Sequence, residues 1–180
     1  MNKHSGFTLV ELVVVIILLG LLAATALPRF LSVTDQARNA SVEGVAGGFA
    51  SGVALVRAQF FADGHSSGGD PGKSVTMDGL TVFVNENGWP ANTSDASSAS
   101  FDNQTAQECL EVWNYVFQSP PAATTSAGSI SNELYLASSS ASGTDFFCDF
   151  DLIVDGQIDQ TRHFTFNLET GQVRTTLPAQ

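Results

Sequence analysis

The sequence predicts an α+β fold, in which one long N-terminal helix packs against a head built on a meandering antiparallel sheet. Three observations predict it. An apolar run opens the chain, a helical stripe of apolar residues follows it to about Ala62, and the last third reads as short strands separated by turns. With 180 residues, the chain is long enough for one such head and an additional element.

The apolar run covers residues 7–27, which read FTLVELVVVIILLGLLAATAL and carry one charge, Glu11. As a helix this run would rise about 31 Å, which matches the hydrocarbon core of a bilayer. The residues before it, MNKHSG, carry Lys3 and an amino terminus, and positive charges before a span favour a cytoplasmic N-terminus. We therefore expect this run to cross a membrane once.

Two simpler interpretations of the run compete with a functional one. A cleaved secretory signal would use Ala24-Thr25-Ala26, but the run is long for a signal, it contains Glu11, and Pro28 follows that cut closely. An ordinary single-span anchor explains the length but not Glu11, because a carboxylate in the membrane core costs roughly 2.5–3.5 kcal/mol. The third interpretation is that Glu11 has a partner and therefore a function.

A helical pattern continues beyond Pro28. Six apolar residues recur at spacings of three and four and so share one helix face: Val42, Val45, Phe49, Val53, Val56 and Phe60. Glycines at positions 44, 47, 48 and 52 each weaken a helix by roughly 1 kcal/mol relative to alanine. Two explanations stay open: close packing of the helix on the sheet, which we favour, and flexibility or close contact with another subunit.

The head begins with a loop and a hairpin. Residues 63–74 form a loop by composition. Asp78-Gly79 is a strong two-residue turn signal between strands expected at 75–77 and 80–84. Residues 91–103 then read as polar and irregular.

A second helix follows. Thr105 and Glu108 have the spacing of a capping box, and the apolar residues after them predict a short helix that Pro120-Pro121 ends. Trp113 on this helix is expected in the core. Residues 122–144 are rich in small residues, with one strand expected at about 133–137.

The C-terminal part reads as strands throughout. Runs at 146–154, 161–168 and 172–177 alternate apolar and polar residues, and a turn at 169–171 joins the last two. Together with the hairpin, these runs predict the antiparallel sheet of the head.

Composition excludes several classes of function. Seven basic against 18 acidic residues give a net charge of −11, which argues against binding nucleic acid. Three histidines and two cysteines are not clustered, so no metal site or cofactor is expected. Residues 64–68 match GxSxG without its flanking strand and helix, and 72–74 mimic only the tail of a P-loop. We therefore expect no enzyme activity.

Four acidic residues near the C-terminus are candidate ligands for calcium. Asp149, Asp151, Asp155 and Asp159 offer oxygen ligands, which Ca²⁺ prefers, but their spacing is not that of an EF-hand. Asp149 and Asp151 alternate along a strand, so we favour a solvated strand face.

The N-terminal residues resemble a known family. Gly6-Phe7-Thr8-Leu9-Val10-Glu11, followed by the apolar run, is similar to the N-terminus of type IV pilins and type II secretion pseudopilins. The resemblance implies that a prepilin peptidase cuts after Gly6 on the cytoplasmic side of the membrane and methylates the new N-terminal Phe7. It also implies the pilin fold, with a long helix against the sheet.

The same resemblance implies how the chain assembles. An inner-membrane assembly platform would extract subunits from the membrane and pack their N-terminal helices into a filament with other pilins. Glu11 would pair with the amine of Phe7 on a neighbour, which satisfies two costly charges and sets the register. Gly20 and Pro28 would bracket a stretch that partly unwinds in the filament, because both weaken a helix.

Four segments follow from this interpretation. We expect a leader peptide at 1–6, a transmembrane and filament-core helix at 7–28, an amphipathic half of the same helix at 29–62, and a β-rich head at 63–180. The chain would sit in the inner membrane before assembly and in an extracellular pilus afterwards.

Cys109 and Cys148 are the only cysteines. In an exported chain an even pair indicates a disulfide, here bounding a region at 109–148, although two buried free thiols are the alternative. Closing a loop of about 40 residues would contribute roughly 4 kcal/mol in the chain-entropy model.

Within the family, residues 28–60 look most like the MSHA (mannose-sensitive haemagglutinin) type IVa pilins, and more like a minor than the major subunit. That likeness implies a structural fibre subunit used in surface attachment and biofilm formation. The alternative is a pseudopilin in a type II secretion piston. An exported enzyme on an anchor has no candidate site residues to support it.

Overall fold

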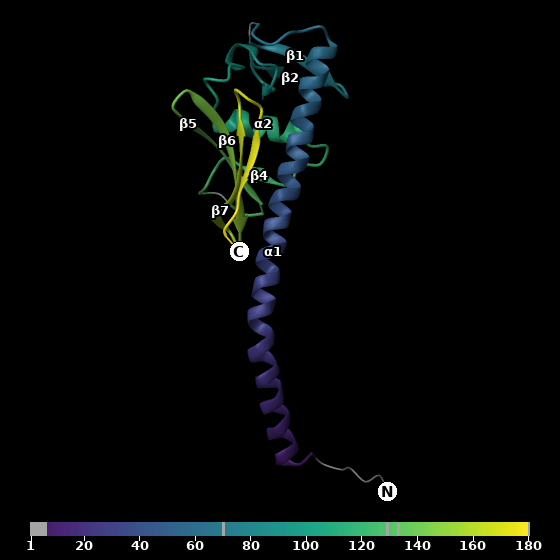
Figure 1. Ribbon diagram of the computed structural model, residues 1–180, viewed down its shortest axis with the longest axis vertical. Coiled ribbons are helices and arrows are strands. Elements are labelled where there is room, and N and C mark those ends of the chain that lie inside the picture. Colours follow the sequence, from purple (N-terminus) through teal and green to yellow (C-terminus); the bar gives the residue numbers. More distant parts are fainter. Residues whose placement is uncertain (1–6, 70, 129, 133, 180) are drawn as a thin grey trace. The chain divides into compact units, whose positions relative to one another are not determined.

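The computed structural model describes residues 7–69, 71–128, 130–132 and 134–179. Gly6 and the rest of the expected leader lie outside these residues. The chain divides into two compact units, one ending at Ala40 and the other covering Ser41–Gln180. Helix α1, Leu9–Ala62, runs through the boundary between them (Figure 1).

The first unit is the N-terminal part of α1. Its apolar side chains are exposed around the whole helix, from Leu9 at 78% to Phe30 at 70%. Its most apolar 18-residue window has a mean hydropathy of 2.7 and is unburied, so α1 is long and apolar enough to cross a membrane. The helix continues without interruption through Gly20 and Pro28, so unwinding of this stretch in a filament stays a prediction.

The second unit contains the rest of α1, and there the predicted apolar stripe is confirmed. Five of its six residues are at most 2% exposed, and Val45 is half-buried. Phe49 lies at the centre of the core, with its ring 5.1 Å from Phe150 and 5.6 Å from Phe164. Farther along α1, Val56 and Phe60 pack in a smaller cluster with apolar residues of the first hairpin.

Two sheets make up the rest of the unit. The first is antiparallel, in the order β1-β2-β3, with β1 at Lys73–Met77, β2 at Leu80–Val84 and β3 at Pro90–Asn92. β1 and β2 lie near the C-terminal end of α1 (Figure 1).

The second sheet has five strands in chain order. They are β4 at Ala123–Thr124, β5 at Tyr135–Ser142, β6 at Asp145–Val154, β7 at Gln157–Asn167 and β8 at Val173–Thr176. β4 pairs with β5 in parallel, and all other neighbours are antiparallel. The α+β fold class is therefore confirmed, with two sheets in place of the single one expected.

The helix that comes between the two sheets along the chain also forms as predicted from the sequence. A short 3₁₀ turn, η1 at Ala96–Ser98, precedes helix α2 at Ala106–Val116, which opens on the expected capping box of Thr105 and Glu108. Trp113 is fully buried, and its Nε1 donates a hydrogen bond of 2.9 Å to the Pro121 carbonyl.

Four elements differ from the expectation, and one of them is β4, which was not predicted as a strand. Pro90–Asn92 is a fully buried strand where irregular chain was expected, because it pairs with β2. β5 extends to Ser142 although its second half is mostly serine, because the backbone ladder with β6 continues to the Ser142–Asp145 pair. β7 begins at Gln157, since Asp155 and Gly156 form a tight turn with positive φ angles of 52° and 75°.

Candidate functional site

The N-terminal end of α1 carries the residues expected to act in assembly. Phe7 is 79% exposed. Thr8 donates to Glu11 Oε2 from its backbone nitrogen at 2.9 Å and from its hydroxyl at 2.8 Å, and Glu11 N returns a bond to the Thr8 hydroxyl at 3.2 Å. These reciprocal bonds are a capping box. Its Thr-x-x-Glu spacing is visible in the sequence, within the apolar motif.

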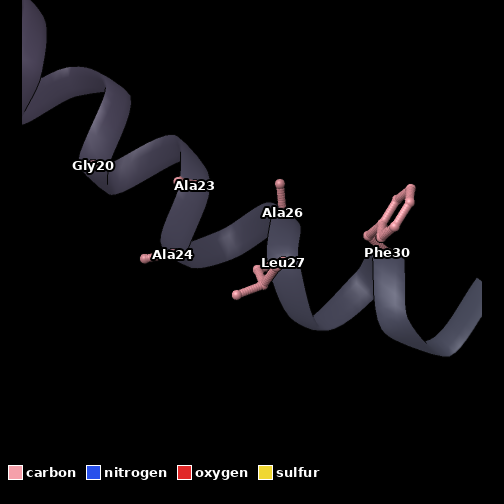
Figure 2. A pocket seen from close by; sticks show the side chains of 6 residues that line it. All are labelled: Gly20, Ala23, Ala24, Ala26, Leu27 and Phe30. Atoms are coloured by element: carbon pink, nitrogen blue, oxygen red, sulfur yellow. The ribbon is translucent and has the colours of Figure 1, made fainter.

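A shallow hollow lies farther along the same helix, and α1 alone lines it (Figure 2). Its lining consists of Gly20, Ala23, Ala24, Ala26, Leu27 and Phe30. Three alanines and a glycine leave little side-chain volume on this face, and a Cβ placed on Gly20 would meet nothing within 4 Å. Small residues of this kind let a second helix approach closely in an apolar medium.

The four glycines beyond it fall into two pairs. A Cβ on Gly52 would lie 2.5 Å from the Val116 carbonyl oxygen, and one on Gly48 would lie 3.1 Å from the Phe117 ring. Both therefore permit close packing, against the end of α2 and not against the sheet. Gly44 and Gly47 have open space where a Cβ would lie, so packing does not account for them.

The loop after α1 does not form a catalytic elbow. α1 precedes residues 64–68 and turns follow them, so the strand and helix that GxSxG needs are absent from the described parts of this loop. Gly72 has φ of +80°, and a side chain there would overlap the Ala96 backbone. Within the residues the structure describes, no group of three or more histidine, cysteine or acidic side chains is placed to hold a metal ion.

Of the four C-terminal acids, Asp149, Asp151 and Asp159 are half-buried on β6 and β7, and Asp155 is exposed in the turn between these strands. Burial raises the pKa of the Asp151 carboxyl, and the His163 ring, whose Nδ1 lies 3.8 Å from Asp151 Oδ1, only partly offsets it. Burial would also raise the pKa of Asp159, but hydrogen bonds from Thr161 and Arg162 outweigh it and lower that pKa. Arg162 forms an ion pair of 2.6 Å with Asp159.

The expected disulfide is confirmed. Cys109 of α2 and Cys148 of β6 are bonded, with their Cα atoms 5.4 Å apart. Both residues are fully buried in the main core. The bond therefore joins the second helix covalently to the centre of the five-stranded sheet.

A hydrogen-bonded contact between the two sheets was not predicted. Asn85, 1% exposed, donates from Nδ2 to the Leu168 carbonyl at 2.7 Å, and its Oδ1 accepts from Asn87 N and Trp89 N. The Trp89 ring lies where a Gly171 side chain would be. No local pattern signals this contact, because its two sides are more than 80 residues apart.

The sequence is similar to those of several known proteins. Residues 1–27 match the family model described as the prokaryotic N-terminal methylation motif. The type IV narrow pilus major component PilA5 of Thermus thermophilus is 38% identical over 107 residues, which cover 59% of this chain and 79% of that protein. A fimbrial protein of Moraxella nonliquefaciens is 34% identical over 98 residues, covering 53% of this chain and 62% of that protein.

A secretion protein is also similar. Type II secretion system core protein G of Pseudomonas aeruginosa is 37% identical over 61 residues, which cover 34% of this chain and 43% of that protein. No solved structure matches the chain significantly.

The apolar N-terminal helix with its methylation motif, the sheet packed on its outer half and the pilin relatives all agree. The chain belongs to the type IV pilin family and is a structural subunit of a type IV pilus or of a related pseudopilin assembly.

Proposed function

We propose that the chain is a structural subunit of an MSHA-like type IV pilus, which a bacterium uses for surface attachment and biofilm formation. A prepilin peptidase would cut after Gly6 and methylate Phe7, and the assembly platform would then extract the subunit from the inner membrane. The observation that carries the proposal is the methylation motif over residues 1–27, joined to an apolar helix whose side chains are exposed on all sides.

The exposed helix supports assembly through its own surface. An apolar helix of this length is stable in lipid or among other apolar helices, but not in water. The small-residue face at Gly20–Phe30 allows close helix packing (Figure 2). The segment would thus be a membrane anchor before assembly and filament core afterwards.

Glu11 would provide the register between subunits. Its Oε2 takes both Thr8 bonds, while its Oε1 has no hydrogen bond within the described residues. This oxygen is therefore available to the N-terminal amine of Phe7 on a neighbouring subunit. In apolar surroundings such a pair neutralises two charges that are costly alone.

The choice of filament rests on the stretch at 28–60, which resembles MSHA pilins and, among them, the minor pilin called B. A pseudopilin is the second candidate, because the chain is also similar to a type II secretion core protein. Surface filaments that contain this chain and vanish with the MSHA assembly genes would support the first candidate. Periplasmic retention with lost protein secretion would support the second.

Processing is tested by the N-terminal mass of the mature chain, isolated from cells that have prepilin peptidase and from matched cells that lack it. N-methylated Phe7 in the first cells and intact Met1 in the second are expected. A start at Leu27 in both would mean an ordinary secreted protein and would overturn the proposal. Intact Met1 in both would leave a plain membrane anchor.

Glu11→Ala tests the pairing. We expect the variant to be inserted and cleaved, but to enter filaments about tenfold less or worse, because breaking a buried charge pair costs about 3–5 kcal/mol. Thr8→Val is the matched control, since it removes both hydrogen bonds of the Thr8 hydroxyl and keeps the carboxylate. If both variants assemble equally poorly, the helix cap and not the pairing is what assembly needs.

A further inference from the structure

The outer edge of strand β5 is open along most of its length. β4 pairs only with Tyr135 and Leu136, and no other strand among the described residues lies beside the rest of this edge. Residues 139–142 are all exposed, although they belong to a strand of the five-stranded sheet. An open edge presents unpaired backbone donors and acceptors, which a further strand can use.

The pairing of β5 with β6 determines which backbone groups face the open edge. Ile153 N donates to the Leu134 carbonyl at 2.8 Å, so these two residues are a hydrogen-bonded pair. Such pairs alternate along an antiparallel ladder, and the register of β5 with β6 has no shift. Even-numbered residues of β5 therefore bond to β6, and the N–H and C=O of Ser139 and Ala141 point to the open edge. The direction of Tyr135 N agrees, because it donates away from β6, to the segment just before β4, at 3.2 Å.

This edge lacks the features that usually prevent pairing between edge strands. Residues 134–144 contain neither a charged residue nor a proline. The strands at the ends of the two sheets differ: β1 begins with Lys73, β3 begins with Pro90, β8 contains Arg174, and β4 has two residues only. Charges, prolines and short strands all hinder the addition of a further strand, so the open edge of β5 is the one that permits it.

A second copy of the same segment fits this edge in one register. Antiparallel pairing centred on Ser140 places Ser139 of each copy opposite Ala141 of the other, and both of these residues direct their backbone groups outward. Each such pair exchanges two backbone hydrogen bonds. A centre nearer to Ala137 would put the second strand in the position that β4 occupies, and a centre nearer to Gly143 would leave fewer bonds.

The serine side chains suit the same register. Those of Ser138, Ser140 and Ser142 lie on the opposite face of the sheet from the buried side chain of Ala137. With the centre on Ser140, this residue lies opposite itself and Ser138 lies opposite Ser142. These are the non-hydrogen-bonded pairs, in which side chains come closest. A hydroxyl both donates and accepts, so serines can hydrogen-bond to one another across the strands.

We propose that residues 138–142 of β5 pair in antiparallel fashion with the same residues of a second copy of this chain. Such a pair has a two-fold axis, whereas subunits that point the same way along one filament have no two-fold axis between them. The pair therefore joins subunits of two different filaments, a consequence that rests on the filament assembly proposed above. Each contact is small and weak, and its repetition along two filaments makes the association strong.

Cysteine cross-linking tests the register on the processed full-length subunit in dodecylphosphocholine micelles, with micelles in excess over subunits. Under oxidation by copper–phenanthroline, Ser140→Cys should form disulfide-linked dimers, because the two Cα atoms would lie about 4.5 Å apart. Ser142→Cys is the matched control, since its two copies would be about 14 Å apart along the strands, and it should give about tenfold fewer dimers or less. A mixture of Ser138→Cys and Ser142→Cys should restore the dimer, because these positions would lie opposite each other. Ser139 is left unchanged because it lies opposite Cys148 on β6.

A charge on the edge tests whether strand pairing brings the thiols together. Ser140→Lys, added to both members of the Ser138→Cys and Ser142→Cys mixture, places like charges directly opposite each other and should reduce the dimer yield about fivefold or more. Ser119→Lys is the matched control, because Ser119 is exposed and lies outside the strands, and it should change the yield less than about twofold. Fluorescence of the buried Trp113 checks that the variants keep the fold.

The cross-links form between unassembled subunits, so they test the pairing whether or not filaments form. Absence of the Ser140→Cys dimer would overturn the proposal, and so would equal dimer yields from Ser140→Cys and Ser142→Cys. A yield that Ser140→Lys leaves unchanged would overturn it as well. In electron micrographs, filaments of the Ser140→Lys variant should stay separate where wild-type filaments associate side by side. Equal association of both would overturn the link between filaments.

Discussion

The chain contains the same Thr-x-x-Glu capping box twice, at Thr8–Glu11 and at Thr105–Glu108, in opposite surroundings. The geometry is nearly identical. The threonine backbone nitrogen donates to the glutamate at 2.9 and 2.8 Å, the hydroxyl donates at 2.8 Å in both, and the return bond is 3.2 Å in both. The four-residue motif alone therefore determines the local hydrogen bonds, whatever surrounds it.

The second carboxylate oxygen is where the boxes differ. Glu108 is 8% exposed, and its Oε1 accepts from the Ser98 hydroxyl at 2.6 Å and from Asn92 Nδ2 at 3.4 Å. Glu11 is exposed, and its Oε1 has no hydrogen-bond partner in the described part of the chain. Glu108 therefore has both carboxylate oxygens hydrogen-bonded inside the head, whereas Glu11 keeps one oxygen without a hydrogen bond among the described residues.

The largest expected effect tests this difference directly. Glu108→Ala should lower the free energy of unfolding of the head by about 3 kcal/mol, because Asn92, Ser98 and the α2 cap lose a charged acceptor at once. Glu11→Ala should change the same quantity by less than about 0.5 kcal/mol. The measurement is denaturant unfolding of the micelle-solubilised chain, followed by fluorescence of the buried Trp113. Equal losses of unfolding free energy in the two variants would mean that the two glutamates do not differ in what they contribute to the head.

Elements with a local cause were predictable. The Asp78-Gly79 hairpin formed as expected, with Met77 paired to Leu80. The α2 capping box and the apolar stripe of α1 also formed, because each depends on residues within one or two turns. Two further local signals overlap with stronger sequence features. The Asp155-Gly156 turn lies within a group of acidic residues, and the Thr8–Glu11 capping box lies within the membrane motif.

Elements with a distant cause were not predictable. β3 is a strand because β2 lies beside it, and the serine-rich half of β5 is a strand because β6 does. Backbone pairing across a sheet needs no particular side chain, so composition does not reveal it. The roles of Gly6 and Phe7 in processing and of Phe7 and Glu11 in assembly, in contrast, stay predictions that rest on a family resemblance.

Two glycines of α1 give a second comparison of like residues, and its expected effect on stability is smaller. Gly52→Ala should lower the free energy of unfolding by about 2 kcal/mol, because its methyl group would lie 2.5 Å from the Val116 carbonyl oxygen. Gly44→Ala should raise the same free energy by about 0.5–1 kcal/mol, because it gains helix propensity and meets open space. Thermal or denaturant unfolding of both variants measures the difference in sign.

The sign of the stability change in Gly44→Ala also tests the role of a glycine that has open space where a Cβ would lie. If Gly44→Ala stabilises the free subunit but reduces its entry into filaments, Gly44 serves a contact between subunits. Stabilisation with normal assembly would mean that this glycine is merely tolerated. If both alanine variants destabilise the head equally, the account of the two environments is wrong.

The smallest expected effect comes from two aspartates on the neighbouring strands β6 and β7, whose pKa values shift in opposite directions. The pKa of Asp159 is lowered in the folded state, so its charge stabilises the head above the unfolded pKa of about 4, and this contribution is lost as pH falls through the folded pKa. The pKa of Asp151 is raised mainly by burial, so its ionisation destabilises the head once pH rises from the unfolded value through the folded one.

Asparagine variants separate the two signs. Asp159→Asn should reduce stability at pH 7 and have progressively less effect as the pH falls below about 4, where the wild-type carboxylate is also protonated. Asp151→Asn should increase stability at pH 7 and lose that advantage at a higher pH, as the pH falls from the raised folded pKa of Asp151 to the unfolded value of about 4. Each difference should be within about 1 kcal/mol, because both side chains keep some contact with water. Unfolding curves at several pH values measure both differences. A shift of stability in the same direction in the two variants would contradict this account. It would mean that the summed negative charge around the two aspartates outweighs their individual surroundings.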